Sequence, residues 1–182
     1  MPKKRKSRRK REKTKKPTLT EQFKGKGIEI TERIKEIILD FKRIRNAIKE
    51  IKRTGNNALF VAGKENVFPD KIKAVRIGYS ILYVAKVLEE LMDRLEKICD
   101  EEDMERFTSI IKSPAFSEYL ILAWRQCREG NDDRIKERYE LIFGLDGLES
   151  IANRYNIRIK PYSKISKADV EVEDIKKIKP NI

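Results

Sequence analysis

Apolar residues recur at alternating spacings of three and four along residues 34–51 of this chain. They are Ile34, Ile37, Phe41, Ile44, Ile48 and Ile51. This spacing keeps an apolar stripe on one side of a helix for nearly three heptads, which is typical of a helix packed against another helix. Thr31 is a suitable N-cap for it. We expect the helix to run to about Arg53 and to end at Gly55-Asn56-Asn57.

A second long helix is predicted from an Asp70 cap to about Cys99, and it is apolar on nearly every side over residues 74–88. A helix of this kind is covered by neighbours on several sides. It therefore indicates either the centre of a bundle or a large interface between subunits. Gly78 with Ser80 favours a close helix crossing there.

Four shorter helices are predicted downstream, over residues 100–112, 115–128, 132–143 and 148–155. Tyr119 and Trp124 fall in phase with their apolar neighbours, so we expect both in the core and not as base-stacking platforms. The predicted fold class is all-α, a bundle of about five to six helices over residues 31–156.

The segments on either side of this bundle differ from it in character. Residues 1–30 are predicted to form a basic arm and a linker, which Gly25 and Gly27 keep flexible. Residues 157–182 are predicted to form an extended tail. Ile157 to Lys160 and Val170 to Val172 alternate as strands do. These two stretches either pair as a small hairpin or lie extended along a neighbouring subunit.

The excess of positive charge is concentrated at the N-terminus. Residues 1–16 carry eleven Lys or Arg against the single acid Glu12, which is +10 of the net +13 of the whole chain. A segment without large apolar side chains after Met1 cannot offset the entropy of ordering, so we expect a disordered arm. Such an arm binds phosphate polymers by releasing their counterions. The alternatives are a solubilising tail or, in a eukaryote, a nuclear localisation signal in residues 2–6.

The first long helix extends this basic character. Lys35, Lys42 and Lys49 share one outer heptad position, about 10 Å apart along the axis. Charged outer positions are usually a solvated face, but here they follow directly on the arm, and together they predict one phosphate-binding surface. The predicted nucleic-acid-binding residues are Lys3, Lys4, Arg5, Lys6, Arg8, Arg9, Lys10, Arg11, Lys13, Lys15, Lys16, Lys35, Lys42, Arg43, Arg45, Lys49, Lys52 and Arg53.

Signs of catalysis are missing from the sequence. The chain has no histidine, the commonest general base and metal ligand, and no phosphate-binding glycine motif. The acidic run 100–103 is expected to be a helix start and not a Mg²⁺ site, because consecutive helical residues point in different directions. Cys99 and Cys127 are expected to be reduced core thiols. We therefore predict a protein that is not an enzyme and holds no metal or cofactor.

Two further expectations come from composition. No apolar run of about 18 residues is present, so we expect no membrane span, and no apolar segment typical of a secretory signal follows the basic start. Abundant Lys, Glu and Ile with only two Gln indicate a thermophilic source, although an AT-rich genome produces the same bias.

The layout of a basic arm, a long basic helix and a bundle of apolar helices resembles that of the coat proteins of archaeal filamentous and rod-shaped viruses. The stretches Ala74-Val75-Arg76-Ile77-Gly78-Tyr79 and Glu118-Tyr119-Leu120-Ile121-Leu122-Ala123-Trp124 are similar in texture to the bundle helices of that family. The resemblance implies homodimers or heterodimers whose N-terminal helices wrap double-stranded DNA inside a helical virion. This chain differs from the rod-shaped members in its longer, denser arm and in its tail after Tyr155.

The function expected from the sequence is that of a structural nucleoprotein. It would bind double-stranded DNA, favoured over RNA, without sequence specificity, and would assemble with itself or with a paralogous coat subunit in a virion. The alternative is a cellular DNA- or RNA-associated regulator, in the cytoplasm, nucleoid or nucleus, whose bundle binds a protein. A third option is an accessory subunit of an enzyme complex with little affinity for DNA.

Overall fold

The computed structural model describes residues 15–63, 70–129, 131–144 and 147–172. These residues form seven α-helices and no strand, which confirms the predicted all-α class. The helices are α1 (Leu19–Gly25), α2 (Glu32–Gly63), α3 (Lys71–Ile98), α4 (Glu101–Lys112), α5 (Pro114–Glu129), α6 (Asp133–Phe143) and α7 (Leu148–Arg154). Two short 3-10 turns follow, at Tyr162–Lys164 and Lys167–Asp169.

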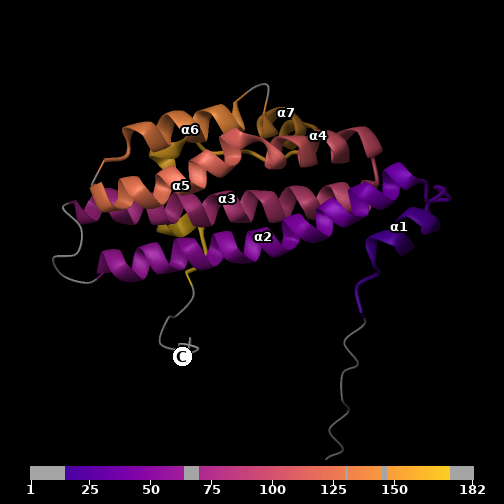
Figure 1. Ribbon diagram of the computed structural model, residues 1–182, viewed down its shortest axis with the longest axis horizontal. Helices are drawn as coiled ribbons and strands as arrows, with labels where there is room; N and C mark the ends of the chain where they lie inside the picture. The colour runs from indigo at the N-terminus through magenta and orange to yellow at the C-terminus, as the bar shows by residue number, and fades with distance from the viewer. Residues whose placement is uncertain (1–14, 64–69, 130, 145–146, 173–182) are drawn as a thin grey trace, which may run out of the picture.

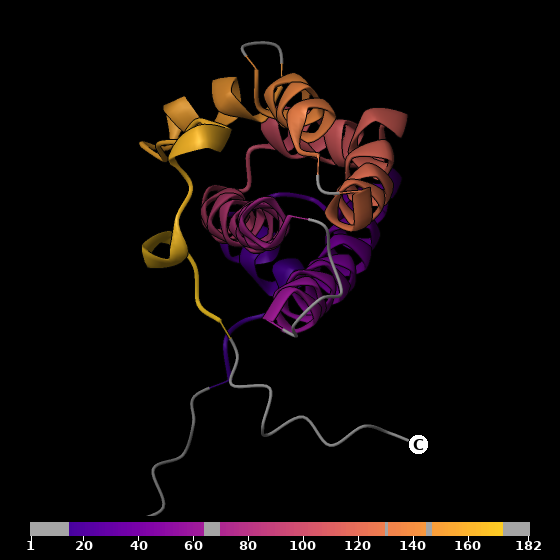
Figure 2. The same ribbon diagram turned by 90° about the vertical axis from the view of Figure 1, so that its left-hand side faces the viewer.

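The helices form an elongated up-and-down bundle of four rows (Figure 1). The long helices α2 and α3 run antiparallel as a hairpin. Helices α4 and α5 follow one another as a third row, and α6 and α7 make the fourth. Seen along the long axis, α3 lies in the middle, with α2, α5 and the C-terminal segment around it (Figure 2).

Helix α3 owes its apolar sequence to this central position. Ile77, Ile81, Val84 and Leu88 are fully buried within the chain itself. Of the two alternatives that the sequence left open, the centre of the bundle is therefore the observed one. The predicted cap is also observed, because the Asp70 carboxylate accepts the Lys73 N–H at 3.0 Å.

The start and the apolar stripe of α2 follow the prediction, and its end does not. The Thr31 hydroxyl accepts the Ile34 N–H at 3.3 Å, and all six residues of the stripe are buried. The helix continues through Gly55 to Gly63, so the predicted end was wrong. A Cβ on Gly55 would lie 2.8 Å from Leu82 Cγ of α3. This glycine permits a close helix crossing and does not stop the helix.

The close crossing predicted at Gly78 is observed, on the other helix of the same hairpin. A Cβ on Gly78 would lie 2.7 Å from Leu59 Cδ2 of α2. Because Gly55 and Gly78 each receive a leucine of the opposite helix, α2 and α3 approach each other closely over this part of the hairpin. The stretch 58–62, expected to be a connector, is instead helical and supplies Leu59 to this contact.

The predicted flexible linker contains helix α1. Thr18 and Glu21 form a capping box, in which the Thr18 hydroxyl accepts the Glu21 N–H at 3.3 Å and the Glu21 carboxylate accepts the Thr18 N–H at 2.6 Å. Phe23 is fully buried and anchors α1 on the bundle. Of the two glycines in this segment, Gly27 has a positive φ, +73°, in the turn that leads to α2, and Gly25 ends α1.

The two predicted strands are absent from the described residues 157–172. Backbone groups of this segment form hydrogen bonds with tyrosine hydroxyls and not with a neighbouring strand. The Lys160 N–H donates to Tyr83 Oη at 2.9 Å, and Tyr139 Oη donates to the Lys160 carbonyl at 2.6 Å. Ile157 is buried. The alternation therefore reflects a segment that packs along its own bundle, and the hairpin, one of the two alternatives left open by the sequence, is not observed in these residues.

The cores of the remaining helices agree with the sequence, with one exception. Tyr119 is fully buried and shares a hydrogen bond of 2.9 Å with Ser80. Trp124 is 39% exposed on α5, so its predicted place in the core was wrong. Cys99 is a buried free thiol whose pKa is raised by burial. The side chain of Cys127 lies outside the described part of the chain.

Among the described residues, no helix is both long enough and apolar enough to cross a membrane.

Candidate nucleic-acid interface

Most of the predicted arm cations lie outside the described residues. Lys3 to Lys13 precede the first described position, whereas Lys15 and Lys16 are described and exposed. Pro17 and Thr18 then lead directly into α1. The position at which the arm joins the bundle is thus fixed by the capping box and by the buried Phe23.

A groove of about 530 Å³ lies where the arm joins the bundle, and we name it the arm-root groove. One wall comes from the residues that enter and form α1, the other from α2, with two acids of α3 at the edge. It is lined by Lys16, Pro17, Thr18, Leu19, Thr20, Gln22, Ile38, Phe41, Lys42, Arg45, Asn46, Lys49, Asp93 and Glu96. The structure thus places predicted cations of the arm and of the first long helix around one groove.

Lys42 and Lys49 are the cations of α2 that remain available in this groove. Both are exposed, and neither has an ion-pair partner among the residues that the structure describes. They lie two helical turns apart on the same face, with Asn46 between them. Ammonium groups at this spacing, together with neutral donors, suit contacts to successive phosphates of a backbone.

Arg45 occupies the same face but is neutralised by α3. Its guanidinium donates two hydrogen bonds to the Glu96 carboxylate, at 3.0 and 2.8 Å, and a third to Asp93 at 2.8 Å. The hydrogen bond with Glu96 is the main reason why the pKa of Arg45 is raised. A bidentate pair of this kind joins two helices and leaves little positive charge for an external anion.

The other predicted cations of α2 are also paired. Lys52 contacts Glu89 of α3 at 2.6 Å, while Lys35, Arg43 and Arg53 each pair with an acid three residues earlier on α2. The Lys35 and Arg53 pairs are exposed and therefore weak, and Arg43 shares its partner Asp40 with Lys112. Those three cations can therefore exchange a carboxylate for a phosphate. The Lys52 pair instead links α2 to α3.

Several groove residues were missed at the level of sequence. Thr18, Gln22 and Asn46 line the groove and carry hydroxyl or amide donors that suit phosphate oxygens. Thr18 and Gln22 were overlooked because residues 17–30 were taken as a flexible linker, and Asn46 because only charged residues of the first long helix were considered. The signal was present, since Thr18 followed three positions later by Glu21 is the sequence pattern of a capping box.

The acidic run at the start of α4 has a structural role. Asp100 caps the helix by accepting the Asp103 N–H at 2.9 Å. Asp103 is buried and accepts hydrogen bonds from Arg154 and from the Tyr155 hydroxyl, each at 2.6 Å. Burial and this hydrogen bond raise the pKa of Tyr155. No group of three or more potential metal ligands occurs among the described residues.

Comparisons with protein-family models, with curated proteins and with solved structures gave no match to this chain.

Proposed function

We propose that this chain is a structural nucleoprotein that binds double-stranded DNA through its basic arm and the arm-root groove, without reading base sequence. The observation that carries the proposal is the position of the arm. Eleven cations in sixteen residues lead into a groove where Lys42 and Lys49 have no acidic partner among the described residues. Phosphates that contact the arm can therefore continue onto α2.

The proposal assigns the groove to the nucleic-acid backbone. Contacts from lysines, threonines and amides to phosphate and sugar fix position and carry no sequence information. The exposed side chains in the groove include no aromatic ring that could stack on a base, and Phe41 is buried. A groove of this composition favours backbone contacts over stacking on single strands.

Self-assembly on the nucleic acid is part of the proposal, in the form of a coat or packaging protein. The apolar faces of α2 and α3 no longer support it, because the chain's own core covers them. Support comes instead from large apolar side chains left exposed on several helices. They are Leu39, Phe60, Ile72, Ile98, Ile121, Trp124 and Leu141. Of these, Ile121 and Trp124 line one depression on α5, and exposed apolar side chains that lie together mark contacts with other proteins.

The test is binding to random-sequence double-stranded DNA and RNA across a salt series, followed by negative-stain electron microscopy. If all eleven arm cations meet phosphates, log K should fall against log salt with a slope of about −10. Regular filaments or particles on DNA would support packaging. Removal of residues 1–16 should abolish the steep slope, while circular dichroism reports an intact bundle. A shallow slope for the intact chain refutes the proposal.

An adaptor protein is the second candidate, and one surface favours it. Ile121 is 64% exposed next to Trp124 on α5, and the two line a shallow depression with Arg125 and Glu129. A tryptophan and an arginine together are typical of protein interfaces. This candidate predicts discrete complexes of fixed size that form without nucleic acid, whereas the packaging proposal predicts assembly that requires the polymer.

A further inference from the structure

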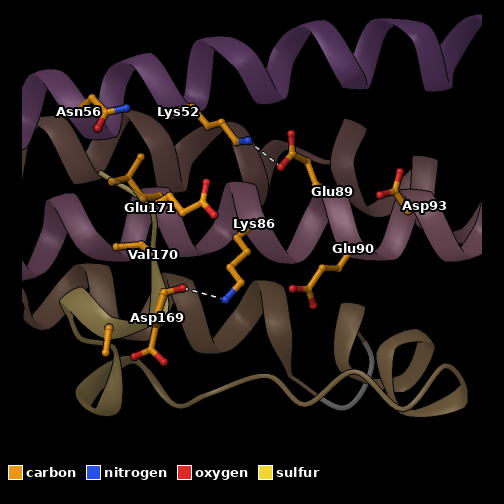
Figure 3. A pocket seen from close by; sticks show the side chains of 11 residues that line it. Lys52, Asn56, Lys86, Glu89, Glu90, Asp93, Asp169, Val170 and Glu171 are labelled. Carbon is orange, nitrogen blue, oxygen red and sulfur yellow. Dashed lines mark hydrogen bonds and ion pairs between the residues drawn. The ribbon is translucent and has the colours of Figure 1, made fainter. Parts of the chain in front are cut away.

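A second groove, of about 410 Å³, runs along the bundle beside the arm-root groove, and we name it the C-terminal groove (Figure 3). Helices α2 and α3 form its floor and the end of the described chain forms one side. It is lined by Lys52, Asn56, Leu82, Lys86, Glu89, Glu90, Asp93, Ala168, Asp169, Val170 and Glu171.

The C-terminal groove carries an excess of negative charge. Five carboxylates and two ammonium groups line it, and Arg45 and Lys160, from outside the lining, pair with Asp93 and Asp169. The remaining excess therefore comes from Glu90 and Glu171. Lys52 pairs with Glu89 at 2.6 Å, and Lys86 donates to the Asp169 backbone carbonyl at 2.9 Å. Both cations are thus engaged by groups of the groove itself. The groove therefore suits a positively charged occupant.

Two of the carboxylates are available to such an occupant. Glu90 and Glu171 are exposed, and no ion pair joins either of them to another part of the described chain. Figure 3 shows their side chains on either side of Lys86, one from α3 and one from the C-terminal segment. They approach the groove from two different elements, as the walls of a docking surface do.

The arm begins beside this groove. Asp93 lines both the C-terminal groove and the arm-root groove, where Lys16 lies. The two ends of the described chain lie on the same side of the bundle, below α2 (Figures 1 and 2). Fourteen residues precede Lys15, and a chain of that length spans at most about 50 Å when extended. The basic arm can therefore reach the whole groove.

We propose that residues 1–13 of the same chain dock in the C-terminal groove when no nucleic acid is bound, and that nucleic acid displaces them. Tethering supplies a local concentration in the millimolar range, which makes even weak ion pairs significant. Exposed pairs of lysine and glutamate are individually weak and are screened by salt, so docking is reversible. A phosphate polymer competes well because it offers many contacts and releases counterions.

Docking gives the bundle a way to regulate the proposed function, and to that extent it rests on it. An arm held in cis is shielded from other anions, and only a dense polyanion displaces it. Docking lowers the apparent affinity of every ligand that requires a free arm by the same factor. Weakly bound short or sparse anions then no longer bind appreciably, whereas long nucleic acid, which binds more tightly through many contacts, still does. The C-terminal groove thereby sets a threshold of affinity for ligands of the arm.

The first test measures docking without nucleic acid. A water-soluble carbodiimide joins a lysine amine to a glutamate carboxyl as an amide only where the two are in contact. Digestion with a glutamate-specific protease then releases the arm as residues 1–12, because Glu12 ends that fragment. We expect this fragment to be joined to Glu90 and Glu171 at low salt, and the yield to fall when DNA is added. Glu137, exposed on α6 on the far side of the bundle, is the matched control.

Two results of this test would overturn the proposal. The first is a yield at Glu90 and Glu171 no higher than at Glu137. The second comes from mixing chains of normal and heavy isotopic composition. Arm fragments joined to grooves of the other isotope would assign the groove to a neighbouring copy and not to the arm of the same chain.

The second test measures the effect on DNA affinity. Changing Glu90→Gln together with Glu171→Gln should raise affinity about threefold to tenfold at low salt, from the loss of two exposed pairs, and the gain should vanish at high salt. The control variant Glu137→Gln with Glu140→Gln changes net charge equally and should have less effect. Equal gains in both variants would contradict coupling through the groove.

The two proposals fail in different ways. If the arm is cross-linked to Glu90 and Glu171 but the protein does not bind DNA, docking is supported and the proposed function is refuted. Steep, salt-dependent DNA binding without cross-links above the control level would support the proposed function and refute docking.

Discussion

Lys42 and Lys49 provide the sharpest test of the arm-root groove, because they are its cations on α2 that pair with no acid among the described residues. We consider the double variant Lys42→Gln with Lys49→Gln. Each ammonium that contacts a phosphate of B-form DNA contributes about −0.9 to the slope of log K against log salt. Removing both should therefore make the slope shallower by about 1.8. This corresponds to a loss of about 60-fold in affinity at 0.1 M salt, relative to a 1 M reference.

The stability of the protein should change little in this variant. Both lysines are exposed, and neither forms an ion pair with the rest of the described chain. Glutamine has nearly the same helix propensity as lysine. The thermal midpoint measured by circular dichroism should stay within a few degrees, so that a change in binding reflects the surface and not unfolding.

A matched control separates position from net charge. Arg134 and Lys136 are exposed on α6, on the other side of the bundle, and neither pairs with an acid in the described part of the chain. Changing both to Gln removes the same two charges. Fluorescence anisotropy with a labelled duplex at five or more salt concentrations gives both slopes. An equal change in the two variants, or no change for Lys42 and Lys49, would refute the proposed surface.

Three further predictions concern the bundle. Gly55→Ala should destabilise the fold by about 1 kcal/mol in urea unfolding, because overpacking against Leu82 outweighs the gain in helix propensity. Tyr139→Phe should lower the free energy of unfolding by about 1 kcal/mol, through the lost hydrogen bond to the Lys160 carbonyl. The Lys160 ammonium holds the pKa of Asp169 at about 2, below its usual 3.8. Its contribution to stability is therefore complete above about pH 4 and lost as the pH falls to about 2, which the carboxyl chemical shift in an NMR titration would report.

The helices of this chain were predictable wherever one periodic pattern dominated. The α2 stripe and the apolar run in α3 are both buried as their spacing required, since each helix packs directly on the other. The same periodicity could not locate the end of α2. Gly55-Asn56-Asn57 has the composition of a helix C-terminus. Only the contact of Gly55 with Leu82 of another helix shows that this glycine permits a close helix crossing.

The C-terminal segment shows a different limit. Alternation of apolar and polar residues from Ile157 to Lys160 predicts a strand, because one side of the segment must be buried. One side is buried, but it lies against helices. Its backbone groups bond to the hydroxyls of Tyr83 and Tyr139, which lie far away in sequence. Periodicity reports which residues are buried and not which groups accept their hydrogen bonds.

Prediction of the candidate interface from sequence meets the same limit. Counting cations on α2 treats Lys42, Arg45, Lys49 and Lys52 as equivalent, since all are basic and on outer positions. The acids that distinguish them, such as Glu89, lie on α3, so no property of the α2 sequence alone could reveal the pairing. The ion pairs of Arg45 and Lys52 with α3 neutralise these two cations and link the two long helices.

The bundle therefore offers a polyanion fewer unpaired cations than the sequence suggests. The arm must supply most of the affinity. Of the charges that the proposal assigns, eleven belong to residues 1–16 and two are free cations of α2 in the groove. At about −0.9 each, the arm accounts for about −10 of the expected slope and the two lysines for about −1.8. The bundle then serves chiefly to fix where the arm begins and, through the C-terminal groove, where it rests.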